Sequence, residues 1–313
     1  MLHDPLSDIL ALVAARSALS TGLIAGGDWA VRVDGHTGWK FNAVLQGHAW
    51  LDIEGEAGPV ALGAGDCFVL TSGAPFVIGS ALALTPVPAA LLYANTADGV
   101  ARLGTGSDFH VLGGKMLFDQ ADSGLLAEGL PGVIVLRATA PAAAHVAWLL
   151  KRLVEELRDA RPGQAAMADQ LMQMLFIESL RAWLGSEGAG ASRHVGWIGA
   201  LADSRLRAAV QAMHGAPARA WTLAELSGIA CMSRSSFAAR FKVAVGMAPL
   251  EYLQRWRMRL ASRDLRKGLA SVSAIAASLG YASDSAFSNA FKRVQGMSPL
   301  AYRRSHGGAS AGQ

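Results

Sequence analysis

A gapless internal repeat constrains this chain more than any other feature of its sequence. Residues 233–252 align on residues 283–302, and ten of the twenty positions are identical: Ser, Ser, Phe, Phe, Lys, Gly, Met, Pro, Leu and Tyr. With one inserted residue the match continues upstream, where Leu223 faces Val272. Chance does not supply such agreement, so the C-terminal third contains two copies of one structural unit.

Each copy predicts a helix, a tight turn and a second helix. Ser233 and Ser283 stand where an N-cap begins the second helix, and Gly246 and Gly296 stand where a left-handed C-cap ends it. Two phenylalanines four residues apart mark the buried face of that helix, Phe237 and Phe241 in the first copy and Phe287 and Phe291 in the second. The pattern predicts two helix-turn-helix motifs, in which the second helix enters the major groove of DNA.

The side chains opposite or beside the buried face form the predicted DNA interface. Small polar side chains near the start of a helix can approach base edges, and a lysine one turn after the last phenylalanine is placed for phosphates. The candidates are Arg234, Ser235, Ser236, Ala239 and Lys242 in the first copy and Ser285, Ser288, Asn289 and Lys292 in the second. Singly, each also fits an ordinary solvated face. The same phenylalanine and lysine spacing in both copies favours an interface.

The segment between the copies, residues 249–267, contains no internal Gly or Pro and predicts one continuous helix. Such a connector would fix the two motifs relative to each other. Successive major grooves lie about 34 Å apart along DNA. We therefore expect one polypeptide to address two of them.

Charge is divided unevenly along the chain. Residues 191–313 contain 17 Lys and Arg and five Asp and Glu, a net charge of +12, whereas residues 1–190 carry a net charge of −8. A basic surface also confers solubility, but this division indicates a polyanionic partner for the C-terminal part alone.

The N-terminal part predicts an antiparallel β-barrel. Short apolar or alternating runs recur between Gly-, Asp-, Pro- and Ser-rich turns, at residues 29–33, 39–45, 49–53, 60–62, 67–70 and 76–78. We expect an α+β chain with a cupin-like domain at residues 1–140, a helical connector at 141–190 and an all-α domain at 195–306. The Gly/Ser-rich stretch 185–196 is the predicted linker.

The connector predicts two helices, at residues 145–158 and 167–184. An apolar stripe on the first includes Leu149, Leu153, Val154 and Leu157. This stripe fits either the seam of a homodimer or a face that packs back on the barrel, and the sequence leaves both open.

The repeat resembles the DNA-binding domain of AraC-family transcription regulators, over about residues 198–304, and the second copy reads IAASLGYASDSAFSNAFKRVQGMSPLAYRR. The front half, with GGDWAVRV, WKFNAVLQG and GAGDCFVLTSGAPF, resembles the cupin-type regulatory domain of one subgroup of that family. The resemblance implies a bacterial transcription factor. Its N-terminal domain would sense or dimerise, its C-terminal domain would bind double-stranded promoter DNA, and RNA polymerase is a candidate partner.

The turn of the first motif departs from the family, which usually has Gly where this chain has Cys231. A left-handed conformation there would cost roughly 1–2 kcal/mol. The family's base-reading positions fall here on Ser235, Ala238 and Ala239, of which only Ser235 has a polar side chain. We therefore expect phosphates to supply much of the first motif's affinity.

The front half does not carry the metal ligands of a cupin enzyme. No His-x-His pair occurs, and Phe76 takes the place of the late His, so we expect no metal and no cofactor. A small organic effector remains a candidate ligand of the barrel. Five aromatic residues are candidate walls of its pocket, although aromatic residues at strand spacing also fit plain core: Trp29, Trp39, Phe41, Trp50 and Phe76.

Cys67 is a candidate for sensing an oxidant, because relatives in this subgroup are thought to respond to oxidants. A sensing thiol needs exposure and a lowered pKa. Cys67 instead begins an apolar run, and the only other cysteine is Cys231. A buried structural cysteine is therefore the favoured interpretation.

The N-terminus has acidic residues and no basic leader before its short apolar stretch, and every long apolar stretch is too short or contains Pro. We therefore expect a soluble, cytoplasmic protein. The favoured function is a sequence-specific DNA-binding transcription regulator and not an enzyme. The alternative is a cupin-fold enzyme fused to a basic helical module.

Overall fold

The computed structural model describes residues 4–12, 16–94, 96, 99–118, 130–141, 143–159, 161–185 and 196–306. It divides into two compact units, one of residues 15–192 and one of residues 1–14 with 193–313. Most of the predicted linker, from 186 to 195, lies outside the described residues. None of the described helices is long and apolar enough to cross a bilayer.

This division differs from the predicted boundaries at two places. The first helix, α1 (Pro5–Leu12), packs on helices of the C-terminal unit, because its apolar side chains Leu6, Ile9 and Leu12 are buried there. The two connector helices, α4 (Ala143–Asp159) and α5 (Gln164–Leu184), belong to the N-terminal unit.

Two sheets build the N-terminal unit and enclose its core. The six-stranded sheet has the order β11 (Val133–Leu136), β6 (Cys67–Leu70), β3 (Trp39–Gln46), β10 (Phe109–Leu117), β1 (Arg16–Gly26) and β9 (Val100–Gly104). The five-stranded sheet has the order β5 (Val60–Gly63), β4 (His48–Ile53), β7 (Phe76–Gly79), β2 (Ala30–Val33) and β8 (Val87–Pro88), and is followed by the short helix α2 (Ala89–Tyr93). The six predicted runs correspond to β2 through β7.

The predicted fold class is confirmed, with two refinements. The sheets form a sandwich instead of a closed barrel, and two strand pairs, β1 with β9 and β2 with β8, are parallel. Buried side chains from both sheets meet between them, among them Leu51, Phe68 and Phe109.

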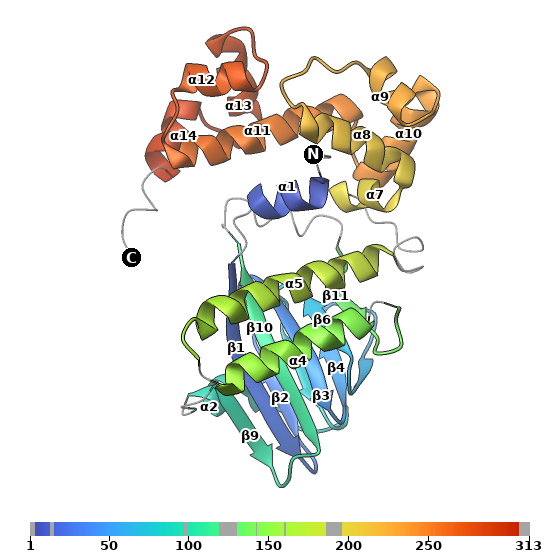
Figure 1. Ribbon diagram of the computed structural model, residues 1–313, viewed down its shortest axis with the longest axis vertical. Helices are drawn as coiled ribbons and strands as arrows, with labels where there is room; N and C mark the ends of the chain where they lie inside the picture. The colour runs from blue at the N-terminus through green and yellow to red at the C-terminus, as the bar shows by residue number, and fades with distance from the viewer. Residues whose placement is uncertain are drawn as a thin grey trace. The chain divides into compact units, whose positions relative to one another are not determined.

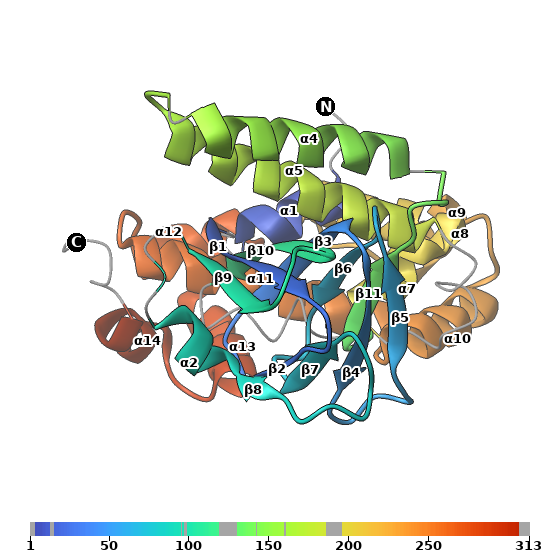
Figure 2. The same cartoon turned by 90° about the horizontal axis from the view of Figure 1, so that it is seen from below.

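The six-stranded sheet is covered on both faces. Helix α5 packs on its outer face, and α4 packs on α5 (Figures 1 and 2). The ring centroids of Trp39 and Phe176 lie 5.2 Å apart across this interface. Leu149 and Leu153 of the apolar stripe are buried, so this part of the stripe packs within the unit.

The described C-terminal unit is helical apart from its loops and turns. Its helices after α1 are α7 (Trp197–Ala202), α8 (Ser204–Gly215), α9 (Leu223–Ile229), α10 (Arg234–Val245), α11 (Pro249–Lys267), α12 (Val272–Ser278), α13 (Asp284–Gln295) and α14 (Pro299–His306). Figure 1 places α9 and α10 at one end of α11 and α12 and α13 at the other.

Candidate nucleic-acid interface

The two sequence copies fold with the same local chemistry. The Ser233 hydroxyl accepts a hydrogen bond from the backbone N–H of Ser236 at 3.2 Å, and Ser283 caps α13 in the same way. Gly246 and Gly296 end the two helices with φ of 81° and 77°. The predicted caps are confirmed, and they fix where each exposed helix begins and ends.

Identical aromatic clusters hold the two helices in place. Phe237, Phe241, Phe287 and Phe291 are each fully buried. The second phenylalanine of each copy meets a tyrosine of the following helix edge to face, Tyr252 with centroids 5.7 Å apart and Tyr302 at 5.4 Å. Because one face of each helix is anchored in this way, the opposite face is fixed outward.

The predicted contact residues lie on those outward faces. Arg234, Ser235, Ser236, Ala239 and Lys242 of α10 are exposed, as are Ser285, Asn289 and Lys292 of α13. Ser288 is half-buried, as is Ala238, one of the positions that the resemblance assigned to base reading. Each helix thus offers a short row of small polar side chains at its N-terminal end and a lysine near its last turn.

Helix α11 sets the distance between the copies. Its 19 residues correspond to a length of about 28 Å at 1.5 Å per residue. That length is close to the spacing of about 34 Å between successive major grooves on one side of B-DNA. The predicted continuous connector is confirmed.

A second connection between the copies was not predicted from the sequence. The Arg257 guanidinium, on α11, donates to the carbonyl oxygens of Pro217 at 2.6 Å and Arg219 at 2.8 Å. The loop that carries these carbonyls also touches the turn of the second motif, since a β-carbon at Gly280 would lie 2.0 Å from the Ala218 carbonyl oxygen. We call the loop segment 217–219, Arg257 and Gly280 the junction.

The turns of the two motifs have the same backbone geometry but different residues. The backbone N–H groups of Met232 and Tyr281 close equivalent bonds to Ser227 and Ala276. The preceding residue is left-handed in both, Cys231 with φ of 52° and Gly280 with φ of 80°. Cys231 is the one non-glycine with positive φ among the residues that the structure describes.

Cys67 lies in surroundings that do not suit a sensing thiolate. Its side chain is buried, and burial together with the neighbouring Asp66 raises the pKa of the thiol to about 12. At neutral pH the group is therefore a protonated thiol, in line with the structural interpretation. Cys231, by contrast, is exposed.

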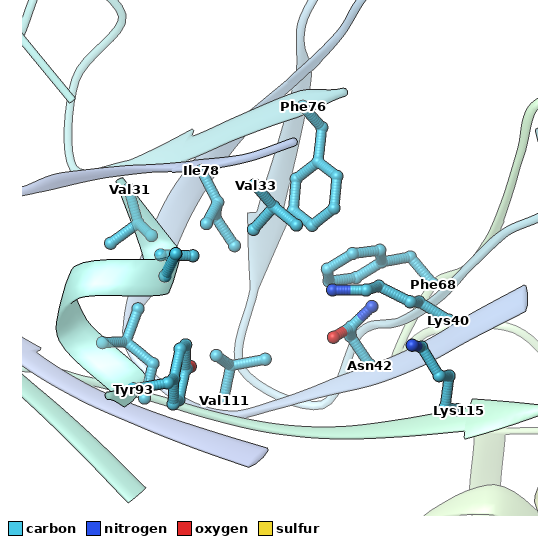
Figure 3. A pocket seen from close by; sticks show the side chains of 13 residues that line it. Val31, Val33, Lys40, Asn42, Phe68, Phe76, Ile78, Tyr93, Val111 and Lys115 are labelled. Atoms are coloured by element: carbon cyan, nitrogen blue, oxygen red, sulfur yellow. The ribbon is translucent and has the colours of Figure 1, made fainter. Parts of the chain in front are cut away.

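Of the five predicted aromatic wall residues, Phe76 lines the cavity of the N-terminal unit (Figure 3). Trp39 and Phe41 lie on the opposite face of β3, where Trp39 meets α5. Trp29 packs against Phe109 in the core with ring centroids 4.7 Å apart, and Trp50 is 38% exposed. The polar lining residues Lys40, Asn42 and Lys115 were missed. Within the described part of the chain, no group of three or more His, Cys, Asp or Glu side chains is arranged to hold a metal ion.

Comparisons with known proteins cover both units. A cupin family model matches residues 4–185, and a helix-turn-helix domain model matches residues 226–305. A putative AraC-like transcription regulator of Streptomyces lividans is 42% identical over 301 residues, covering 96% of this chain and 98% of that protein.

The chain is also similar to a more distant regulator and to part of one solved structure. The RCS-specific HTH-type transcriptional activator RclR of Escherichia coli K12 is 28% identical and covers 96% of this chain and 97% of its own length. Among solved structures, the DNA-binding domain of AdpA in complex with a target DNA is 32% identical, covers 33% of this chain and 92% of that domain, and has a TM-score of 0.31. The chain belongs to the AraC-like transcription regulators, with a cupin domain ahead of a helix-turn-helix domain that binds DNA.

Proposed function

We propose that the C-terminal unit reads a promoter through α10 and α13, one helix in each of two successive major grooves, and that the N-terminal unit controls this binding. The observation that carries the proposal is the repeated arrangement of a buried aromatic face opposite an exposed polar row, at both ends of α11. Lys242 and Lys292 would bind phosphates, and Asn289 would bind a base edge.

The remaining partners are proposed on separate grounds. Trp148 on α4 and Met174 on α5 are 62% and 48% exposed, which supports a homodimer through these helices, since exposed large apolar side chains mark interaction surfaces. Contact with RNA polymerase and a cytoplasmic location follow from the family alone. The names of the relatives support a regulator over an enzyme.

The direct test is a gel-shift assay with DNA that flanks the protein's own coding sequence, repeated over a range of salt concentrations. Specific binding whose affinity falls steeply with salt is expected, because phosphate contacts release counterions. Footprinting should reveal two protected segments about one helical turn apart. Protection of one segment alone would contradict the two-groove arrangement.

Lys242→Ala and Lys292→Ala should each weaken binding to every DNA sequence by a similar factor. Each should also reduce the slope of log K against log salt by about one unit at most. Filter binding at several salt concentrations measures this slope. Lys151→Ala, at an exposed position on α4, is the matched control. An unaltered slope in both α10 and α13 variants would contradict the phosphate role.

Asn289→Ala should relax the preference for one base pair and leave the salt slope unchanged. An amide side chain typically makes a paired contact to adenine, and losing such a contact costs about 1–3 kcal/mol of discrimination. Selection of binding sites from random DNA, followed by sequencing, compares the consensus of the variant with that of the parent chain. An identical consensus would remove Asn289 from the base-reading set.

A further inference from the structure

A cavity of about 290 Å³ lies inside the N-terminal unit, between the two sheets and beside α2 (Figure 3). Most of its lining is apolar and comes from five strands and α2: Leu23, Val31, Val33, Phe68, Phe76, Ile78, Ala89, Ala90, Tyr93 and Val111. The volume equals that of roughly ten water molecules at about 30 Å³ each, so the cavity fits a small organic molecule.

Three polar side chains gather at one end of this cavity. Lys40 on β3 and Lys115 on β10 are partners in the strand register, and Asn42 lies two residues further along β3. Figure 3 shows the two ammonium groups and the amide on the side away from Val31 and Tyr93. The cavity is therefore cationic at one end and apolar at the other.

These cationic groups have no counterion of their own among the described residues. Neither Lys40 nor Lys115 forms an ion pair or hydrogen bond there, and no acidic residue lines the cavity within the described part of the chain. The Asn42 amide nitrogen is buried without a hydrogen-bond partner. Buried donors are almost always satisfied in folded proteins. A buried amide without a partner, beside two half-buried ammonium groups that form no ion pair among the described residues, favours an acceptor group at this end of the cavity.

The closeness of the two lysines is electrostatically unfavourable. Burial and the neighbouring charge of Lys115 lower the pKa of Lys40. Both effects disfavour the protonated, positively charged form of Lys40. The Lys40 Nζ lies 5.5 Å from the Phe76 ring centroid, a cation–π contact that only partly offsets the lost hydration. An anion between the two lysines would relieve both costs.

We infer that this cavity binds a small organic carboxylate, whose carboxylate is held by Lys40, Lys115 and Asn42 and whose apolar body lies against Val31, Ile78 and Val111. The inference deepens the proposed function, since it gives the N-terminal unit the chemical class of its effector. A ligand of about ten non-hydrogen atoms matches the roughly ten water volumes of this cavity. Medium-chain fatty acids and phenylalkanoic acids have this size and shape.

The test is calorimetric titration of the full-length protein, without DNA, with octanoate and with 3-phenylpropionate. At least one should bind, whereas octan-1-ol, which lacks the charge, and inorganic phosphate, which lacks the apolar body, should bind at least tenfold more weakly. Equal binding of octan-1-ol would show that the lysines do not select the ligand. Absence of binding by both carboxylates at millimolar concentration would overturn the inference.

Lys40→Met and Lys115→Met keep the side-chain volume and remove the charge. Each should weaken carboxylate binding by about 10-fold to 100-fold, the usual effect of losing one charged hydrogen bond. Lys151→Met, on the exposed surface of the same unit, should bind as the parent does. Unchanged affinity in both cavity variants would place the ligand elsewhere.

Thermal unfolding separates loss of the site from loss of the fold. The ligand-free Lys40→Met protein should melt about 2–4 °C higher than the parent, because a half-buried charge without an ion pair is gone. At the same concentration, octanoate should raise the melting temperature of the parent clearly more than that of the variant. Since these measurements contain no DNA, their failure is distinct from failure of the promoter-binding proposal, which the gel-shift assay tests.

Discussion

Gly280→Ala is expected to destabilise the C-terminal unit by roughly 2–5 kcal/mol, the sum of left-handed strain and steric overlap. Gly280 has φ of 80°, and its added β-carbon would lie 2.0 Å from the Ala218 carbonyl oxygen. That oxygen belongs to backbone and cannot rotate away as a flexible side chain would. The turn of the second motif and the loop before α9 would have to separate.

The first motif supplies the matched control, since Cys231 holds the equivalent left-handed position and is exposed. Cys231→Gly should stabilise the unit by roughly 0.5–1 kcal/mol, because relief of left-handed strain exceeds the backbone entropy of glycine. Denaturant titration, with hydrogen exchange of peptides from α11 to α13, resolves both changes from unfolding of the N-terminal unit. Equal and small effects in the two variants would show that the Ala218 contact carries little stability.

The helices of the C-terminal unit could be predicted because each copy of the repeat carries the same local sequence signals. The Phe237 and Phe241 spacing, the Ser233 cap and the Gly246 ending depend on residues within one turn of each other, so the sequence alone defines them. The junction escaped prediction because it joins residues 38 or more positions apart through backbone carbonyls. Every residue has a backbone carbonyl, so the residue types do not reveal which carbonyl accepts a hydrogen bond.

In the N-terminal unit, the alternation of apolar and polar residues along a strand leads to the wrong assignment of its core face. Along β3, the large residues Trp39 and Phe41 alternate with Lys40 and Asn42, which is typical of a strand with a core face and a solvent face. Because α5 covers the face with Trp39, the polar face points between the sheets. The sequence could not reveal this inversion, since it depends on a helix more than a hundred residues away.

Strands β1 and β10 were missed for a simpler reason. Residues 16–26 consist mainly of small residues, and β10 contains two adjacent glycines, Gly113 and Gly114. Glycine, and to a lesser degree alanine, is depleted in strands. The pairing of β10 with β3 places Lys115 opposite Lys40 and so builds the cationic end of the cavity.

Arg257→Met is expected to reduce cooperation between the two reading helices, because it removes both hydrogen bonds from α11 to the loop segment 217–219. Bonds to a charged donor contribute about 1.5–3 kcal/mol each when buried. The loop here is partly exposed and water can replace the guanidinium. We therefore expect a loss of stability of about 1–3 kcal/mol in total.

Arg255→Met is the matched control, since Arg255 lies two residues earlier on α11 and makes an exposed ion pair with Glu251 at 3.0 Å. Such a pair within a helix contributes about 0.3–0.5 kcal/mol. Its loss should leave the stability of the C-terminal unit and its DNA affinity near those of the parent.

The distinguishing measurement compares DNA that carries both half-sites with DNA in which one is scrambled. With the junction intact, binding of one helix holds the other at high effective concentration, so the second half-site adds much affinity. In Arg257→Met this gain should fall roughly tenfold, while affinity for the single half-site is retained. A parallel loss on both DNAs would indicate damage to the first motif itself, and no loss on either would mean that α11 alone keeps the two helices in register.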